Sequence, residues 1–399
     1  MVDAPGTPWH GPASVAVRQA NLRERNLAAL VAGVCRATSP PSRADLATEL
    51  SMTRATAARL VDELVAAKVV DEVERERTGR GRPALALRPG SGIVAVGLAI
   101  ETDRVLARAV DLRGDVVVDR VAPTASRDPE SVLDALAREA REVRARLRGR
   151  RVVGVGVAVP GIVTDDGRLL RAPNLGWNDV DVAGALQPFA GRHRVLVANE
   201  ADMAAFVEAE PAPGRPGDWS DFVHVSAAVG VGGSIVTGGR VVAGEHGAAG
   251  ELGHVCVDPS GPACACGSTG CLERYVGLEA LAAVSGLDRD DVAAGMGPRA
   301  AEGDVRCQVA LEQVTHALSV ALASVVNVVG ISSVVLGGHL ATLPPATLDA
   351  IQQRLDARVL GSRWTPVRVR AARGDDAAAA TGAAHSALGD VLARPAAWV

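Results

Sequence analysis

The sequence predicts a small, mainly helical N-terminal domain followed by a larger α/β domain that carries a zinc loop. Apolar residues recur at helical spacing over residues 21–67, and strand and helix signals alternate from residue 93 onward. Within residues 254–271, the histidine and three of the four cysteines stand at a spacing typical of a metal site. We therefore expect an unstructured arm at residues 1–17, the helical domain at 18–90 and the α/β domain at 91–399.

Three helix signals separated by two breaks make up the N-terminal domain. An apolar stripe predicts a first helix over residues 21–36, which the sequence TSPP at 38–41 ends. Ser42 is a plausible N-cap for a second, short helix through residue 50. After a tight turn, Thr53 can cap a third helix that runs to about residue 67. Two short helices joined by such a turn are typical of a helix-turn-helix.

The third helix and the segment after it have features of a DNA-binding surface. Alternating apolar residues at 69–73 and 85–87 predict the two strands of a wing, so the fold is expected to be a winged helix-turn-helix. Between them, residues 79–83 (GRGRP) resemble an AT-hook core, whose arginines enter a narrow minor groove. The alternative is a helical packing module with a charged hairpin. The predicted DNA contacts are Thr53, Arg54, Thr56, Arg59, Arg80 and Arg82.

The α/β domain begins with three strand signals, at residues 93–100, 104–111 and 116–121. A helix is expected over residues 129–147, and a buried strand follows at 152–159. Strands that alternate with helices in this way favour a sheet with helical crossovers.

Four potential metal ligands lie close together in the second half of the chain. His254, Cys264, Cys266 and Cys271 form the pattern H-x9-C-x-C-x4-C. This set fits a closed Cys3His zinc site, which organises structure and does no chemistry, with one zinc per chain. Surface thiols or a disulfide are the alternative. Cys264 and Cys266 are too close in sequence to bridge easily, and three thiols leave one over.

The metal loop also carries a resemblance to a known family. Residues 251–254 (ELGH), followed by Cys-x-Cys-Gly-x-x-Gly-Cys-x-Glu, resemble the ROK family of sugar kinases and sugar-responsive repressors, and supporting matches run from about Val94 to Ala384. The resemblance implies a two-lobed, ribonuclease-H-like fold of the actin and sugar kinase superfamily, with a ligand cleft between the lobes. It also implies that His254 binds zinc through one imidazole nitrogen and offers the other to a sugar hydroxyl.

The same resemblance implies a sugar site. Residues 172–177 (APNLGW) resemble the sugar-contacting asparagine loop of the family, and residues 229–234, 334–338 and 374–377 resemble further turns around its cleft. Pyranose recognition needs several hydrogen-bond donors and acceptors around the ring. For each residue taken singly, and especially for Glu273 and Asn199, the alternative is a solvated polar side chain. The predicted sugar contacts are Asn174, Asn199, Glu200, Glu251, His254 and Glu273.

The phosphate-binding positions of the ROK kinases are altered in this sequence. In those kinases the first strand runs into an Asp-x-Gly-Gly-Thr loop that wraps the ATP phosphates. Here Ala99 replaces the aspartate, Glu101 and Thr102 replace the glycine pair, and Asp103 adds a second carboxylate that repels phosphate. Glu200 stands where the family has its proton-accepting aspartate, and a carboxylate displaced by roughly 1 Å loses rate steeply. The resemblance therefore implies sugar binding without phosphoryl transfer, and no catalytic residue.

Charge is distributed unevenly along the chain. Residues 1–90 carry a net charge of +3, whereas the rest of the chain carries −7. A basic N-terminal domain on an acidic body is compatible with nucleic-acid binding. Because the sequence shows neither a signal-peptide core nor an uncharged run of membrane length, we expect a cytoplasmic protein, in which reduced thiols favour metal binding.

Three functions remain open from the sequence. The leading one is a sugar-responsive transcriptional regulator, most simply a repressor, that binds a palindromic operator and takes a monosaccharide or sugar phosphate in its cleft. The second is an active ATP-dependent ROK sugar kinase with a DNA-binding extension. The third is a structural DNA-binding protein whose C-terminal domain only oligomerises. A palindrome needs two DNA-binding domains, so the regulator is expected to be a homodimer or homotetramer.

Overall fold

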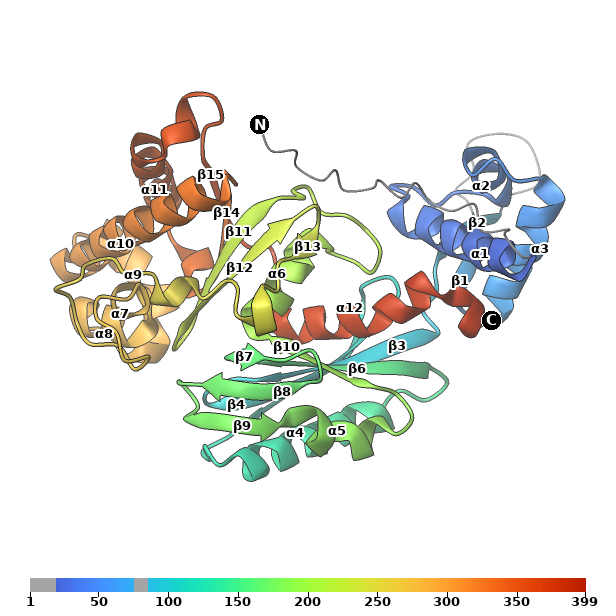
Figure 1. The fold of residues 1–399 in the computed structure, drawn as a ribbon, viewed down its shortest axis with the longest axis horizontal. Coiled ribbons are helices and arrows are strands. Elements are labelled where there is room, and N and C mark those ends of the chain that lie inside the picture. The colour runs from blue at the N-terminus through green and yellow to red at the C-terminus, as the bar shows by residue number, and fades with distance from the viewer. Residues whose placement is uncertain (1–18, 75–84) are drawn as a thin grey trace, which may run out of the picture.

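The computed structural model describes residues 19–74 and 85–399 and shows an N-terminal unit and two lobes, each lobe built on a five-stranded sheet (Figure 1). The arm expected at residues 1–17 lies outside the described residues. So do Arg80 and Arg82, the two arginines of the expected wing tip.

The N-terminal unit consists of three helices and a two-stranded antiparallel sheet. Two caps set its helix boundaries. The Ser42 hydroxyl accepts a hydrogen bond from the Asp45 amide at 3.1 Å while the Asp45 carboxylate accepts one from the Ser42 amide at 2.9 Å, and the Thr53 hydroxyl accepts one from the Thr56 amide. Both predicted caps are therefore confirmed. The elements are α1 (Gln19–Arg36), α2 (Arg43–Glu49), α3 (Arg54–Ala66), β1 (Val70–Glu74) and β2 (Leu85–Pro89).

The first lobe is a mixed sheet with helices on both faces. Its elements are β3 (Ile93–Ile100), β4 (Arg104–Asp111), β5 (Val116–Pro123), α4 (Pro129–Ala145), β6 (Arg151–Val159), α5 (Val182–Ala190) and β10 (Val195–Asn199). The strand order is β10-β6-β3-β4-β5, in which β10, β6 and β3 run parallel. Helices α4 and α5 lie on one face, and α12 (Ala378–Ala393) lies on the other (Figure 1). The strands and the helix predicted for this lobe are confirmed to within two residues.

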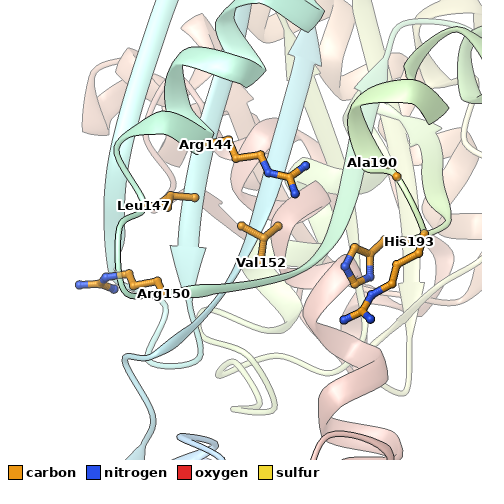
Figure 2. Close-up of a pocket in the computed structure, with 8 residues that line it drawn as sticks. Arg144, Leu147, Arg150, Val152, Ala190 and His193 are labelled. Carbon is orange, nitrogen blue, oxygen red and sulfur yellow. The ribbon is translucent and has the colours of Figure 1, made fainter.

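Two smaller features complete the first lobe. A three-stranded sheet, β7-β8-β9, joins β6 to α5, with β7 (Ile162–Val163), β8 (Arg168–Ala172) and β9 (Trp177–Asp181). A cavity of about 540 Å³ opens between the carboxyl ends of α4 and α5 and the start of β6 (Figure 2).

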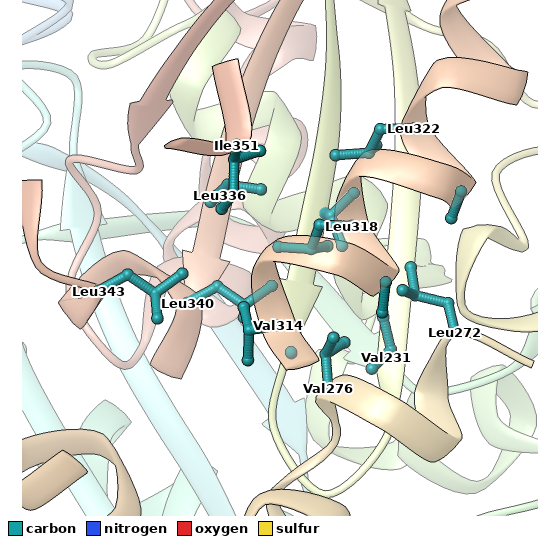
Figure 3. Close-up of a cluster of buried hydrophobic side chains, with 14 of the residues drawn as sticks. Val231, Leu272, Val276, Val314, Leu318, Leu322, Leu336, Leu340, Leu343 and Ile351 are labelled. Atoms are coloured by element: carbon teal, nitrogen blue, oxygen red, sulfur yellow. The ribbon is translucent and has the colours of Figure 1, made fainter. Parts of the chain in front are cut away.

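The second lobe contains the other five-stranded sheet, in the order β13-β12-β11-β14-β15. Helix α6 packs on one face, and α10 lies in the core on the other face, against the cluster drawn in Figure 3. The strands are β11 (Phe222–Ala227), β12 (Val231–Thr237), β13 (Arg240–Val241), β14 (Ser333–Gly338) and β15 (Arg368–Ala371). The helices are α6 (Glu200–Ala209), α7 (Glu273–Val276), α8 (Leu278–Ser285), α9 (Val292–Ala301), α10 (Val305–Val329) and α11 (Pro345–Arg358).

Helix α10 is the one described helix that is long and apolar enough to cross a membrane. Its Val314, Leu318 and Leu322 are fully buried among side chains of β14, α7 and α11 (Figure 3). The same length and composition are typical of the central helix of a large core, and that is the position α10 occupies.

Helix α12 connects the first lobe to the N-terminal unit. Its backbone lies so close to the sheet that a Cβ on Gly97 would come within 1.8 Å of the Ala380 carbonyl oxygen, so only glycine fits at that position. Toward the C-terminus, Leu388 and Val391 share a hydrophobic core with Leu27 and Leu30 of α1. The N-terminal unit is therefore packed on the body through a common core.

Candidate functional site

A cleft of about 540 Å³ lies between the two lobes. Four strands end at it: β3 is followed by Glu101, β10 by Glu200, β11 ends at Ala227 and β14 at Gly338. Ligands of α/β proteins bind outside the carboxyl ends of parallel strands. Position alone thus marks this cleft as the candidate ligand site.

The four predicted metal ligands meet in one cluster beside the cleft. The ligand atoms of His254, Cys264, Cys266 and Cys271 all lie within 4.8 Å of one another. The Sγ atoms of Cys266 and Cys271 are 3.7 Å apart, and the Sγ atom of Cys264 is 3.8 Å from Nδ1 of His254. A tetrahedron with zinc–sulfur bonds of about 2.3 Å has edges of about 3.8 Å. The residues present therefore fit a zinc ion, and the three cysteines are unbridged, so the disulfide alternative is wrong.

The orientation of His254 gives its two ring nitrogens different neighbours. His254 ends a short 3-10 helix, η2 (Leu252–His254), with Nδ1 facing the thiols and Nε2 lying 4.0 Å from Oε2 of Glu251. A Cβ on Gly253 would lie 2.0 Å from the Val231 carbonyl oxygen, so the turn packs directly on β12. Metal at Nδ1 would leave Nε2 beside the Glu251 carboxylate, ready to contact a ligand.

Glu273 joins three parts of the site. Its Oε2 accepts hydrogen bonds from the Val231 amide at 3.1 Å and from Nδ2 of Asn174 at 3.3 Å, and the Cys264 thiol lies 3.8 Å from Oε1. Asn174 comes from the first lobe, whereas Glu273 begins α7 in the second. Glu273 is buried, so its first role is to hold the asparagine loop, β12 and the metal loop together.

Asn199 and Glu200 sit at the end of β10, but they do different things. Asn199 caps α6: its Oδ1 accepts hydrogen bonds from the amides of Ala201 and Asp202, and its Nδ2 donates to the Gly161 carbonyl. Every polar atom of this amide is thus engaged with backbone. Glu200 instead faces the cleft, where burial and the neighbouring Glu101 raise its pKa to about 8. At neutral pH Glu200 can therefore donate a hydrogen bond as well as accept one.

The far end of the cleft contains paired charges. Glu101 accepts a hydrogen bond from Nε of Arg104 at 2.5 Å, and burial raises the pKa of Glu101. Asp103 lies 3.4 Å from Nη2 of Arg289, which belongs to the second lobe, in η3 (Arg289–Asp291). The two arginines that line this end are therefore already matched by carboxylates of the same chain.

Several cleft residues were not predicted from the sequence. Arg104, Arg289 and Asp376 line the cleft and were not named as site residues; Asp376 lies in the recognised turn at residues 374–377, whereas Arg289 belongs to no recognised motif. Asp202 lies below it on α6, where burial raises its pKa to about 6, and its Oδ1 has no partner among the described residues. Acidic residues in the first turn of a helix are usually solvated, so the sequence alone did not single out Asp202.

The predicted DNA contacts on α3 lie on its outer face. Thr53, Arg54 and Arg59 are exposed and Thr56 is half-buried, whereas Ala57 and Leu60 face the core. The Thr53 hydroxyl is used for capping, and Arg59 pairs with Glu63 one turn later. The Arg54 side chain makes no hydrogen bond or ion pair among the described residues, so it is the cation of this face most available to a ligand.

The fold and the metal loop together define a class, a sugar-kinase-like scaffold of two lobes with a Cys3His loop beside its cleft. The chain belongs to the ROK family, whose model matches residues 95–389. It is 25% identical to a xylose repressor of Bacillus subtilis, over 80% of this chain and 84% of that protein. It is 27% identical to a putative xylose repressor of a Caldicellulosiruptor species, over 89% of this chain and 93% of that protein.

The similar solved structures include a transcriptional regulator and a sugar kinase. A ROK family transcriptional regulator, a homologue of the Escherichia coli MLC protein, matches with a TM-score of 0.73 and 25% identity, over 93% of this chain and 98% of that chain. A ROK family glucokinase from Streptomyces griseus, in complex with glucose and AMPPNP, matches with a TM-score of 0.63 and 26% identity, over 73% of this chain and 98% of that chain. The family thus includes both repressors and kinases.

Proposed function

We propose that this chain is a sugar-responsive transcriptional regulator, most simply a repressor. The observation that carries the proposal is the extent of the similarity. A match over 93% of the chain includes the N-terminal unit, and it is a transcriptional regulator that gives it. The glucokinase matches 73%, which has room for the two lobes alone.

The N-terminal unit is the proposed DNA-binding part, as a winged helix-turn-helix. Helices α2 and α3 with their short turn form the helix-turn-helix, and β1 and β2 form the base of the wing. The exposed start of α3, with Arg54 foremost, would enter the major groove, because the N-terminal residues of a recognition helix contact base edges. Arg80 and Arg82 remain predicted minor-groove contacts.

A monosaccharide in the interlobe cleft is the proposed effector. Glu200 and Asn174 line the cleft, whereas Glu251 and His254 do not line it and lie beside it with the metal cluster. Glu200 would contact the sugar hydroxyls, Asn174 would do so if its amide turned from Glu273, and Glu251 and His254 would contact the end of the sugar nearest the metal loop. Zinc would supply a fixed orientation for His254 through Nδ1 and no reaction chemistry. Glu273 and Asn199 would act mainly by positioning their neighbours, since their polar atoms are already bonded within the protein.

Phosphoryl transfer is not part of the proposed function. Glu200 stands where the resemblance places an aspartate as the base, and its raised pKa, about 8, would lower the fraction of ionised carboxylate available at neutral pH to accept the proton of the sugar hydroxyl. Glu101 and Asp103 stand where a triphosphate would need cations or glycine amides. The alternative, an active ROK kinase, predicts ADP release in the presence of a hexose and ATP.

Helix α12 offers a physical route from the cleft to the DNA-binding unit. Its first residues, Ala378 and Ala379, line the cleft, whereas Leu388 and Val391 lie in the core shared with α1. A sugar that closes the lobes would shift the start of α12. Because α1 packs against the end of the same helix, α1 would move with it. Such a ligand acts only through a difference in affinity for the two states, and inverting a 99:1 population takes roughly 10⁴-fold.

The proposal is tested with zinc-loaded, full-length protein. Duplexes selected from a random pool should contain a palindrome, which a cytoplasmic homodimer or homotetramer would bind through two units. Titration with monosaccharides should then change DNA affinity for one sugar and not for ATP. Arg54→Ala should weaken DNA binding at least about tenfold, whereas Arg299→Ala, an exposed arginine on α9, should not. DNA binding that no sugar alters would favour the oligomerisation-only alternative.

A further inference from the structure

The cavity at the far end of the first lobe is separate from the interlobe cleft. It has a volume of about 540 Å³ and an apolar floor made by Leu147, Val152 and Ala190. Arg144 and His193 rise on opposite sides of this floor, whereas Arg150 points outward (Figure 2). A cavity of this size is within the usual range for small-molecule sites.

The lining is strongly and one-sidedly charged. Arg144, Arg150 and Arg192 all line the cavity, and no carboxylate does. Arg150 is partly matched by Asp111, at 3.5 Å, and donates to the Ser91 carbonyl. No hydrogen bond or ion pair to the Arg192 side chain is found within residues 19–74 and 85–399. Arg144 and Arg192 are both solvent-exposed, so the rim of the cavity presents positive charge that the chain itself does not neutralise.

A structural explanation of these arginines accounts for only part of the charge. The cavity lies at the carboxyl ends of α4 and α5, and Arg144 donates a hydrogen bond to the Phe189 carbonyl at the end of α5. Each helix end carries about half a negative charge. Two helix ends thus offset about one of the arginines, and Arg150 has Asp111, which leaves one cation in excess.

The pKa of His193 reflects the same excess of positive charge. Burial lowers the pKa of His193, and Arg192, Arg144 and Arg151 lower it further. The His193 ring stacks on the Trp398 ring with centroids 6.2 Å apart. The Arg151 guanidinium lies over the Trp398 ring, 4.9 Å from its centroid. Trp398 follows η6 (Pro395–Ala397), which contacts α1 of the N-terminal unit. The cavity is thus adjacent to the segment on which that unit packs.

We propose that this cavity binds a small phosphate monoester, whose phosphoryl group is held by Arg144 and Arg192 and whose organic part covers the floor of Leu147, Val152 and Ala190. Guanidinium groups match phosphate oxygens in geometry and charge. A phosphoryl group offers several oxygens that two guanidiniums can share, whereas a carboxylate offers two, and the floor favours an organic group over a bare ion. The site would be independent of the proposed sugar cleft.

Titration calorimetry of the full-length, zinc-loaded protein at low salt tests the proposal, with glycerol 3-phosphate and inorganic phosphate as probes. Both should bind, the monoester more tightly. Arg192→Gln and Arg144→Gln should each weaken binding at least about tenfold, which is the usual loss for a charge-assisted hydrogen bond. Arg146→Gln is the matched control, because this exposed arginine on the same helix pairs with Glu142 outside the cavity.

A second readout separates the site from a general surface charge. Phosphate in the cavity should raise the pKa of His193, measured by NMR, in the wild type and not in Arg192→Gln. Equal binding by all four proteins, or none by any, would overturn the proposal and leave the arginines as helix caps. Loss of DNA affinity and of its salt dependence in Arg192→Gln and Arg144→Gln, without phosphate binding by the wild type, would also overturn it and assign the surface to DNA.

Discussion

The interlobe cleft and the cavity at the end of the first lobe, called the arginine cavity from here on, have the same volume and opposite charge. Seven carboxyl side chains line the interlobe cleft, with two arginines among them, whereas three arginines and no carboxylate line the cavity at the end of the first lobe. Volume therefore says little about what either one binds. The charge of the lining residues distinguishes their ligands. The cleft suits a neutral polyol that offers many hydroxyls, and the arginine cavity suits an anion.

The largest effect should come from removing a metal ligand, because zinc at the Cys3His cluster would organise the residues beside the cleft and none of those at the arginine cavity. Cys271→Ser should abolish zinc binding, whose free energy in structural sites is on the order of 10 kcal/mol. With the loop released, His254 and Glu251 lose their positions, so sugar binding should become undetectable while phosphate binding at the arginine cavity persists. Zinc content and calorimetry measure both.

Cys256→Ser is the control for that experiment. Cys256 is an exposed thiol of the same loop and is not a member of the metal cluster. Normal zinc and sugar binding by Cys271→Ser would show that the cluster does not organise the cleft. Loss of phosphate binding along with sugar binding would show that the two cavities are not independent.

A smaller effect, of a few kcal/mol, concerns the protonation of Glu200. Its folded-state pKa of about 8 lies above the ordinary value near 4.5, so between these pH values the folded protein binds a proton that the unfolded chain has released. Stability should therefore fall as pH rises from about 5 to 8. Glu200→Gln removes this contribution, and the stability difference between variant and wild type should grow in favour of the variant across that range.

Denaturant unfolding of both proteins at pH 5 and pH 8 measures the difference. His224 and His385, whose pKa values burial lowers to about 4, change stability in the opposite direction below pH 6.5 in both proteins, so they cancel in the comparison. A constant gap between the two proteins would mean that the Glu200 carboxyl is ionised and that the cleft is more acidic than proposed here.

A still smaller effect, about tenfold in affinity, should separate a hexose from its 6-phosphate. The carboxylates of Asp103 and Asp376 line the cleft and oppose a phosphate, so the neutral sugar should bind more tightly at low salt, and the gap should narrow as salt is added. Asp376→Asn should improve binding of the phosphate and leave the hexose unchanged. Asp349→Asn, an exposed carboxylate on α11, should alter neither.

If the phosphate instead bound tightly to the cleft at low salt, the charge comparison would fail there. The 6-phosphate should also occupy the arginine cavity, which adds a second binding event to the titration. Arg192→Gln removes that second binding event, so the titration is best repeated in that background.

Features that depend on residues close together in the sequence could be predicted from it, whereas features that depend on residues far apart could not. The caps at Ser42 and Thr53 and the Cys3His loop depend on residues within twenty positions of one another, and the structure confirms them. The arginine cavity combines the end of α4 with the end of α5, about 45 residues later, and its charge means nothing until both are placed. Long-range packing supplied the rest.

The same division holds within the cleft. Glu200 and Asn199 are adjacent and are both predicted sugar contacts, yet Glu200 faces the ligand space and Asn199 caps α6, because a helix begins between them. Arg289 reaches the cleft from the far lobe and belongs to no motif. Motif matching located the strand ends, but only side-chain hydrogen bonds show which polar atoms remain free for a ligand.

The smallest expected effect concerns the ion pair across the mouth of the cleft. Asp103 follows β3 in the first lobe and lies 3.4 Å from Arg289 in the second, and both side chains are substantially exposed. Exposed pairs contribute at most about 1 kcal/mol, so Asp103→Asn should barely change overall stability. Because the pair bridges the lobes, its loss should instead speed sugar dissociation about two- to fivefold at low salt.

Stopped-flow measurement of sugar release at low and high salt would show this. Asp288→Asn is the matched control, since this exposed carboxylate adjoins Arg289 without an ion pair to it in the described chain. Arg289 also lies 3.7 Å from Glu279 of its own lobe, which should keep the guanidinium in place when Asp103 is changed. An equal release rate for all three proteins would mean that the cleft mouth is held by the lobes themselves, and that charge in the cleft selects the ligand without governing its exit.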